Sequence, residues 1–424
     1  MGTFSELDFI KEKIYETEIN TLKVYYIPKK DFTSSFAILT SDFGSADVEF
    51  SIDGGKKFKK YPEGIAHFLE HKMFEMPGGD NIFNRFTELG ASVNAFTNNH
   101  QTSDHFSTTI NFEENLKLLL QMVFTPHLTE ENTEKEKGII AEEIKMYDDH
   151  PGFRGYMEAL KSLYVNHPVK DDIAGTVESI YKLQASDLQE CYDAFYNPRN
   201  MMLVLSGDLE IETFEKIISD YVNPGKDIQL VKKTYDEPKE AKKNSSTIEM
   251  NLQVPNYLYG IKVIPDEESL LKQSLVGSLI TKLVFGSTSD FYEENLRTGE
   301  INDSFSSAMS LDQEHGEIFI GGESKTPEKT LELVETYISN VLMDKDFFKN
   351  KETDLVRIKK AMIGSFVNLF NNVNKIGTTT TGLLLLGENI FEYVEILKNI
   401  TLADVEAKFR DFYQPHHSTK VIIK

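Results

Sequence analysis

Two histidines and a glutamate lie within five residues of one another, at His67, Glu70 and His71. On a helix, residues three and four apart share a face, so both imidazoles can reach one metal ion with the carboxylate beside them. Neutral imidazoles are common zinc ligands, and a carboxylate next to a bound ion can take a proton from water. The order His-x-x-Glu-His therefore predicts a metal site of the kind that hydrolyses peptide bonds.

A third protein ligand is needed, because a catalytic zinc ion usually has three protein ligands and one open position. A glutamate-rich helix is predicted over residues 129–148, and on it Glu136 and Glu143 are seven residues apart and share a face. Glu142 points about 100° away from Glu143. Spacing leaves both Glu136 and Glu143 open as the third ligand. The apolar residues that predict one buried side of this helix are Ile139, Ile140, Ile144 and Met146.

The composition is that of a globular chain long enough for two or three domains. Of its 424 residues 40% are hydrophobic, and its one cysteine, Cys191, cannot form an internal disulfide. The first residues lack a basic stretch followed by an apolar one, and no apolar run approaches about 18 residues. We therefore expect a protein of the reducing cytoplasm, without a membrane segment, whose metal ligands are histidines and carboxylates.

The chain is strongly acidic. Subtraction of 68 acidic from 45 basic residues gives a net charge of −23, which argues against binding of nucleic acid through phosphate neutralisation. Such acidity favours solubility. A second interpretation is that some of the acidic residues line a binding chamber and favour basic peptides.

The two halves of the chain repeat each other. Segments that start at Leu183 and Ile400 match at a constant offset of 217 residues, the distance from Asp187 to Asp404, which indicates a duplication. In each copy the aspartate is expected to be the N-cap of a helix, and Tyr-x-Pro to end that helix before a strand. The matching positions are Asp187, Leu188, Tyr192, Phe195, Tyr196, Pro198 and Val204 in the first copy and Asp404, Val405, Phe409, Phe412, Tyr413, Pro415 and Val421 in the second.

A polar segment separates the copies. Pro224 and Gly225 are followed by a run rich in lysine, asparagine and serine that reaches Ser246, a composition typical of a linker. We therefore predict a metal-binding peptidase domain over residues 1–225, a linker over 226–247 and a homologous domain without a metal site over 248–424.

Strand and helix patterns alternate in both halves of the sequence. The first half has predicted strands at 22–28, 34–41, 91–97 and 104–110 and, besides the His67 helix, helices at 113–124 and 129–148. The second half has predicted strands at 256–264 and 316–324 and helices at 269–285 and 327–342. This alternation predicts an α+β chain of two homologous domains, each a sheet covered on one face by helices.

These residues resemble the pitrilysin/insulinase family of zinc metallopeptidases, the inverzincins, which includes the mitochondrial processing peptidase. In that family a glutamate ligand follows the motif, and another glutamate precedes this ligand by the seven residues that separate Glu136 from Glu143 here. His71 and Glu143 are 72 residues apart, which also fits the family spacing. The resemblance implies one zinc ion per chain, bound by His67, His71 and Glu143, with Glu136 in a supporting role.

The resemblance covers the full length of the chain, including the duplicated domains. It implies the processing-peptidase/LuxS-like metallohydrolase fold, with antiparallel-rich sheets. The segment around the motif is most similar to the bacterial YmfH-like branch, whose members are often paired with a metal-free paralogue.

The mechanism implied by the family is direct attack of water on the peptide bond, without a covalent enzyme intermediate and with Glu70 as general base. Family members also have an Asn-Ala-aromatic-Thr strand that adds the substrate backbone to a sheet edge. The matching residues here are Asn94, Ala95 and Phe96. An ordinary half-buried strand explains the same residues equally well.

The second half departs from the family pattern. Family members carry an arginine and, seven residues later, a tyrosine that bind the substrate and the developing oxyanion. Arg297 matches the arginine, but the tyrosine position holds Ser304, and loss of one oxyanion donor can cost about 10²-fold or more in rate. A metal-free paralogous subunit, or a second copy in a homodimer, is therefore expected to supply the missing group. His315 is predicted to be a turn or surface residue.

Together these features favour a zinc-dependent endopeptidase that cleaves peptides or unfolded segments and needs a paired subunit for full activity. The alternative is a non-catalytic scaffold or partner subunit of a heterodimeric peptidase-like complex, and a metal-storage or metal-sensing protein is a third class. The joint presence of His67, Glu70, His71 and Glu143 favours the enzyme, whereas Ser304 favours the scaffold.

Overall fold

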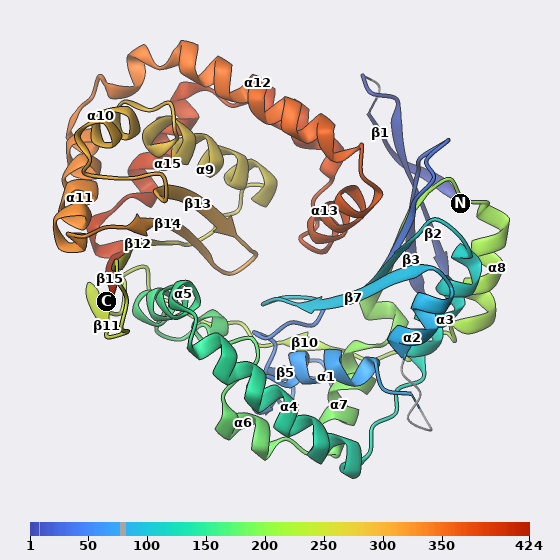
Figure 1. Cartoon of the computed structure of the whole chain (residues 1–424). Helices are drawn as coiled ribbons and strands as arrows, with labels where there is room; N and C mark the ends of the chain where they lie inside the picture. Colours follow the sequence, from blue (N-terminus) through green and yellow to red (C-terminus); the bar gives the residue numbers. More distant parts are fainter. Residues whose placement is uncertain (8, 77–81) are drawn as a thin grey trace. The chain divides into compact units, whose positions relative to one another are not determined.

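The computed structural model describes residues 1–7, 9–76 and 82–424. They form two compact units, each assembled from three segments of the chain (Figure 1). The first unit consists of Met1–Ile144, Asp172–Lys233 and Val367–Phe391, and the second of Lys145–Asp171, Thr234–Phe366 and Glu392–Lys424.

A seven-stranded sheet is the framework of the first unit. Its order is β1-β2-β3-β9-β4-β8-β7, and all neighbours are antiparallel except β3 and β9. Strand β7 ends this order, so its outer edge has no strand neighbour among the described residues. The strands are β1 (Gly2–Leu7), β2 (Glu12–Ile19), β3 (Leu22–Pro28), β4 (Ser35–Ser41), β7 (Ala91–Thr97), β8 (Thr102–Thr108) and β9 (Met201–Gly207). A small second sheet consists of β5 (Glu49–Ser51), β6 (Lys59–Lys60) and β10 (Val231–Lys232).

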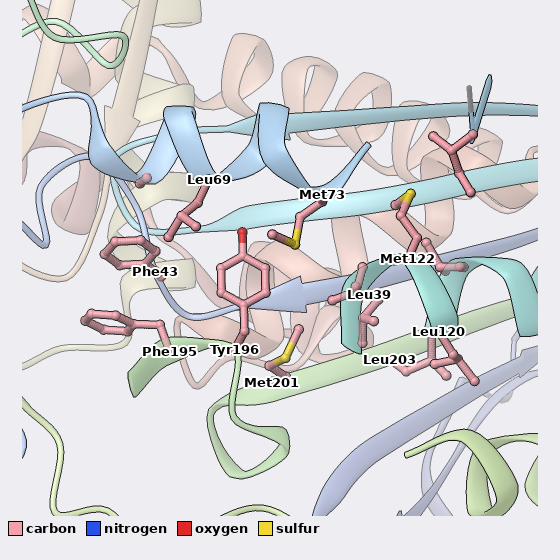
Figure 2. Packing of buried hydrophobic residues seen from close by; sticks show 14 of the residues in the cluster. Leu39, Phe43, Leu69, Met73, Leu120, Met122, Phe195, Tyr196, Met201 and Leu203 are labelled. Atoms are coloured by element: carbon pink, nitrogen blue, oxygen red, sulfur yellow. The ribbon is translucent and has the colours of Figure 1, made fainter. Parts of the chain in front are cut away.

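Helices cover both faces of the large sheet. Leu69 and Met73 of α1 and Met122 of α3 lie in one buried cluster with Leu39 and Leu203 of the sheet (Figure 2). The opposite face receives α13, a helix from the second half of the sequence, which packs on β4 and β9 (Figure 1). The helices of this unit are α1 (Ile65–Met73), α2 (Ile82–Glu88), α3 (Phe112–Phe124), α4 (Glu130–Asp148), α6 (Val177–Lys182), α7 (Ala185–Phe195), α8 (Ile211–Tyr221) and α13 (Val373–Leu385).

The second unit has a five-stranded sheet of order β11-β15-β12-β14-β13, in which only β11 and β15 are parallel. Helix α5, from the first half of the sequence, packs on β12 and β15. The strands are β11 (Ser245–Ile248), β12 (Asn256–Val263), β13 (Ser306–Leu311), β14 (Gly316–Glu323) and β15 (Ser418–Ile423). The helices are α5 (Pro151–Leu163), α9 (Leu270–Phe285), α10 (Asp290–Thr298), α11 (Pro327–Met343), α12 (Glu352–Leu369), α14 (Tyr393–Asn399) and α15 (Leu402–Phe412).

The predicted fold class, two homologous α+β domains with antiparallel-rich sheets, is confirmed. Helices were predicted on one face of each sheet, and in the large sheet α13 covers the second face as well. The structure adds an exchange of helices: α5 of the first half joins the second unit, and α13 of the second half joins the first. The boundaries 1–225, 226–247 and 248–424 describe the duplicated segments of the sequence and stay a prediction. Within the predicted linker, Lys232 of β10 is bound to the first unit by ion pairs to Asp42 at 2.6 Å and Asp47 at 3.0 Å.

The predicted helix caps of the repeat were wrong by three positions. Asp187 and Asp404 are not N-caps; the N-caps are Gln184 and Thr401, and each aspartate is the third helical residue of a capping box. At this position its carboxylate accepts a hydrogen bond from the backbone N–H of the N-cap residue. An acidic side chain stabilises the start of a helix at the N-cap and also in the first turn, so the same residue type fits both positions. The ends of both helices are as predicted, since each is followed by a 3₁₀ turn that starts at the proline and then by a strand.

Candidate metal centre

Helix α1 presents one polar face and one buried face. It begins after Gly64, whose φ is 89° and where a Cβ atom would lie 2.4 Å from the carbonyl oxygen of Ala174, so a side chain there is excluded. The buried face fixes the rotation of the helix and leaves His67, Glu70 and His71 together on the other side. Its buried residues are Ile65, Ala66, Phe68, Leu69, Lys72 and Met73.

Helix α4 brings Glu143 to the two histidines. Nε2 of His71 lies 3.3 Å from Oε2 of Glu143, and Nε2 of His67 lies 3.8 Å from Oε1 of the same carboxylate. Lys72 helps to join the two helices, because its buried ammonium donates to the backbone oxygen of Asn132 at the start of α4. All three side chains offer a ligand atom within 4.8 Å of the others.

These residues fit a zinc ion. Ligand atoms about 2.0–2.2 Å from a tetrahedral zinc ion lie roughly 3.3–3.6 Å from one another, close to the separations between Glu143 and the two histidines. Two imidazoles and one carboxylate are also a ligand set of catalytic zinc sites. His67 presents Nε2 to Glu143, the nitrogen that would bind the ion, while its buried Nδ1 has no hydrogen-bond partner among the described residues.

Glu136 lies behind His71. Its Oε1 is 2.9 Å from Nδ1 of His71, and the carboxylate is almost fully buried. A carboxylate accepts the ring N–H and so leaves Nε2 with the lone pair that a metal needs.

Of the apolar residues expected on the buried side of α4, Ile140 and Ile144 are buried, whereas Ile139 and Met146 are exposed. The burial prediction was therefore right for two of the four, because Ile139 and Met146 lie toward the solvent side of the helix.

The charges of the cluster are strongly coupled. Burial, and after it the charge of His71, lowers the pKa of His67 to about 4. Burial also acts to lower the pKa of His71, but the hydrogen bonds to Glu136 and Glu143 outweigh it and raise this pKa to about 9. The hydrogen bond from His71 in turn lowers the pKa of Glu143. The carboxylates of Glu136 and Glu143 thus stabilise a positive charge at His71, which lies between them.

Glu70 stands beside the histidines on the wall of a cavity of about 840 Å³. One carboxylate oxygen, Oε2, accepts a hydrogen bond of 2.6 Å from the hydroxyl of Thr97. Burial raises the pKa of Glu70. The same cavity is lined by the stacked rings of Phe74 and Phe83, whose centroids are 4.5 Å apart. A carboxylate with raised basicity next to a metal cluster and an open cavity is arranged as a general base requires.

The predicted substrate strand is the edge strand β7. Asn94 and Ala95 line the cavity, and the side-chain oxygen of Asn94 accepts the N–H of Ala95 at 2.9 Å. Phe96 lies on the opposite face of the sheet, where its ring is 6.2 Å from that of His105. The backbone of β7 thus runs along the cavity, whereas the Phe96 side chain does not enter it.

The candidates of the second half belong to the second unit. Arg297 is an exposed residue in the last turn of α10. The hydroxyl of Ser304 donates to Asn302 and accepts the N–H of Glu323, so it holds a turn. Of the two alternatives predicted for His315, the turn is right and the surface position is wrong: His315 lies in the β13–β14 turn but is buried, with Nδ1 3.0 Å from Glu317. Among the described residues, the one cluster of metal-ligand type is that of His67, His71 and Glu143.

Two residues near Glu70 were not predicted. Thr97 ends the Asn-Ala-aromatic-Thr strand identified from the sequence, but its contact with Glu70 was not predicted. Asp104 carries no sequence signal, since its carboxyl is buried within β8 only by the packing of α1 on the sheet.

Comparison with known proteins agrees with this fold. The profile of the insulinase family (peptidase family M16) matches residues 44–177, and that of the peptidase M16 inactive domain matches residues 182–360. An uncharacterized zinc protease of Bacillus subtilis, YmfH, is 37% identical over 410 residues, which are 95% of this chain and 94% of that protein.

Solved structures show the same fold. An M16-like peptidase from Alicyclobacillus acidocaldarius is 30% identical, with a TM-score of 0.90 over 97% of this chain and 98% of that one. A protease from Helicobacter pylori, 18% identical, has a TM-score of 0.81 over 97% of this chain and all of its own. In the described part of the chain, every helix is too short or too polar to cross a membrane.

Proposed function

The chain belongs to the insulinase family, peptidase family M16, and from this premise we propose that it is a zinc-dependent endopeptidase that cleaves peptides or unfolded segments. The observation that carries the proposal is the convergence of His67, His71 and Glu143 at one point with Glu70 beside them on a cavity wall. A scaffold subunit has no need of this combination.

His67, His71 and Glu143 would hold the zinc ion. A bound zinc ion supplies a Lewis acid that acidifies water and polarises the scissile carbonyl. Glu70 takes the proton of the attacking water and passes it to the nitrogen of the leaving amine, so one carboxylate acts first as base and then as acid. Glu136 keeps the His71 ring in the orientation that ligation requires.

Strand β7 offers the place for the substrate backbone. Its outer edge has no strand neighbour among the described residues, and Asn94 and Ala95 line the cavity next to Glu70. A peptide added to this edge would bind through main-chain hydrogen bonds, with little dependence on its sequence. The N–H of Ala95, which donates to the Asn94 side chain in the structure, would then donate to the substrate backbone instead.

A partner chain is part of the proposal. Ser304 occupies the position where the family has a tyrosine, and its hydroxyl is engaged by Asn302 and Glu323. We therefore assign the missing oxyanion donor to a metal-free paralogous subunit or a second copy of the chain, and Arg297 is the residue of this chain retained for that role. A cytoplasmic location, which the single cysteine favours, belongs to the same proposal.

The test is a cleavage assay with Glu70→Gln. The purified chain, alone and mixed with a co-expressed paralogue, is assayed with quenched peptides, and its zinc content is measured. We expect zinc in both proteins and a loss of about 10²–10⁴-fold in kcat for the variant. Full activity of Glu70→Gln contradicts the proposal, as does a wild-type protein that binds no zinc.

A further inference from the structure

Thr97 is the last residue of β7, and its hydroxyl is the one protein group that hydrogen-bonds the Glu70 carboxylate among the described residues. The bond joins Thr97 Oγ1 to Glu70 Oε2 over 2.6 Å, a length typical of a hydroxyl that donates to a charged oxygen. No hydrogen bond to the other oxygen, Oε1, is found among the described residues, and Glu70 lines the cavity. A general base needs this division, with one oxygen held and one available to water.

The hydroxyl of the next strand does not take the place of Thr97 at Glu70. Thr102 stands opposite Thr97 in the β7–β8 register, and the two hydroxyl oxygens are 3.4 Å apart. Thr102 gives its single proton to the backbone oxygen of Phe43 at 2.8 Å. A hydroxyl has one proton to donate, so Thr102 does not donate to Glu70. Thr97 lies closer to the carboxylate, at 2.6 Å, than to Thr102, at 3.4 Å, and donates its own proton to Glu70.

The neighbouring polar groups do not replace this contact. Asp104 is 1% exposed and faces α1 opposite Ala95, but among the described residues no hydrogen bond joins its carboxyl to Glu70. The Tyr196 hydroxyl points toward α1 in Figure 2 and lies near Thr102, Asp104 and Glu70, but no hydrogen bond joins it to the Glu70 carboxylate among the described residues.

We propose that Thr97 is a positioning residue for Glu70: its hydroxyl holds the carboxylate in the orientation from which it accepts the proton of the attacking water. The inference rests on the proposed peptidase function and adds to it. A misplacement of about 1 Å in a catalytic group can cost roughly 10²-fold in rate, so one hydroxyl can have a large effect here. A purely structural role would affect stability instead.

The test compares three substitutions in the full chain, with the partner if the assay requires one. Thr97→Val keeps the shape of the side chain and removes the hydroxyl, whereas Thr97→Ser keeps the hydroxyl. Thr40→Val is the matched control, because it removes another buried hydroxyl, bonded to Ser103 on the opposite face of the same sheet. We measure kcat, KM, zinc content and melting temperature for each.

We expect Thr97→Val to lower kcat about 10- to 100-fold with KM changed less than about threefold and zinc content unchanged. Thr97→Ser should retain most of kcat, and Thr40→Val should lower the melting temperature at normal kcat. In the Glu70→Gln background Thr97→Val should have no further effect, because the group that it positions is gone.

Two outcomes separate the inference from the proposed function. Glu70-dependent cleavage that continues at the normal rate in Thr97→Val overturns the positioning role and leaves the peptidase intact. An additive loss in the Glu70→Gln background, or a Thr97→Ser protein as slow as Thr97→Val, overturns it as well. A wild-type chain without any Glu70-dependent cleavage overturns both.

Discussion

Nδ1 of His71 lies 2.9 Å from Oε1 of Glu136, and the opposite nitrogen of the same ring lies 3.3 Å from Glu143. The imidazole is thus held between two carboxylates of one helix, seven residues apart. The buried carboxylate orients the ring, and the more exposed one is placed to share an ion with it. Glu136 is therefore expected to act on the metal through His71.

Glu136→Gln should weaken zinc binding by about 10- to 100-fold while the chain stays folded. The amide can still accept the ring N–H, but it removes the negative charge that makes the imidazole a stronger ligand. Competition with a zinc chelator measures the affinity. The control is Glu142→Gln, an exposed glutamate on the same helix, which should bind zinc as the wild type does. Equal zinc affinity in both variants would contradict the supporting role of Glu136.

Zinc affinity should fall as the pH falls. The hydrogen bonds to Glu136 and Glu143 raise the pKa of His71 to about 9, so at neutral pH the metal-free protein carries a proton on this ring. Zinc must displace that proton, and each unit of pH below the pKa should therefore weaken binding about tenfold. The dissociation constant is measured by chelator competition between about pH 6 and 8. An affinity that is flat over this range would show that His71 binds zinc without losing a proton.

The metal ligands could be predicted from the sequence because their geometry is local. His67, Glu70 and His71 share one helical turn, and Glu136 and Glu143 share one face of another helix, so helical periodicity alone groups them. Helical periodicity does not show that the two helices lie side by side, and the family resemblance supplied that expectation. The contacts of Glu70 with Thr97 and of Lys72 with Asn132 could not be predicted, because they depend on how α1 packs on β7 and α4.

Long-range packing also explains the parts of the fold that were missed. The sequence pattern of a helix does not indicate which sheet that helix packs on, so the exchange of α5 and α13 between the units was not predicted. Strands β1 and β2 were also missed. Most of their residues are exposed or half-buried, so they lack the nearly continuous apolar run of β3 and β4.

Asp104→Asn should make the protein more stable at neutral and alkaline pH. Burial, and after it the charge of Glu70, raises the pKa of the Asp104 carboxyl well above its ordinary value of 3.8. A carboxyl whose pKa is raised by folding contributes stability that is fully present below the unfolded pKa and lost as the pH rises through the folded pKa. The neutral amide avoids this loss.

Urea denaturation of both proteins at several pH values between about 4 and 8 tests this prediction. The free energy of unfolding of Asp104→Asn, minus that of the wild type, should increase with pH. Asp220→Asn, at an exposed position of α8, serves as control and should follow the wild type. A difference that does not change with pH would mean that Asp104 has the same pKa in both states.

His315 should make the stability of the second unit depend on pH in the range above neutrality. Burial acts to lower its pKa, but the hydrogen bond to Glu317 and the charges of Asp312 and Glu314 outweigh burial and raise the pKa above the ordinary 6.5. The cation lies in the β13–β14 turn, with Nδ1 3.0 Å from Glu317 and the ring 4.9 Å from that of His167. This ion pair is buried, so loss of the proton leaves Glu317 with a weaker partner.

The sign follows from the raised pKa. The stabilising contribution of His315 is fully present below about pH 6.5 and disappears as the pH rises through the higher folded value, because only the folded state retains the proton there. Urea denaturation, followed by the fluorescence of the tyrosines, should show wild-type stability falling over this window. His315→Gln keeps a donor for Glu317 without a titratable charge, so its unfolding free energy should be lower than that of the wild type at pH 6 and approach it as the pH rises through the folded pKa of His315. His416→Gln, at an exposed histidine, controls for the loss of a histidine in general. If His315→Gln retains the full pH dependence of the wild type, the titrating group lies elsewhere and the buried histidine is neutral throughout.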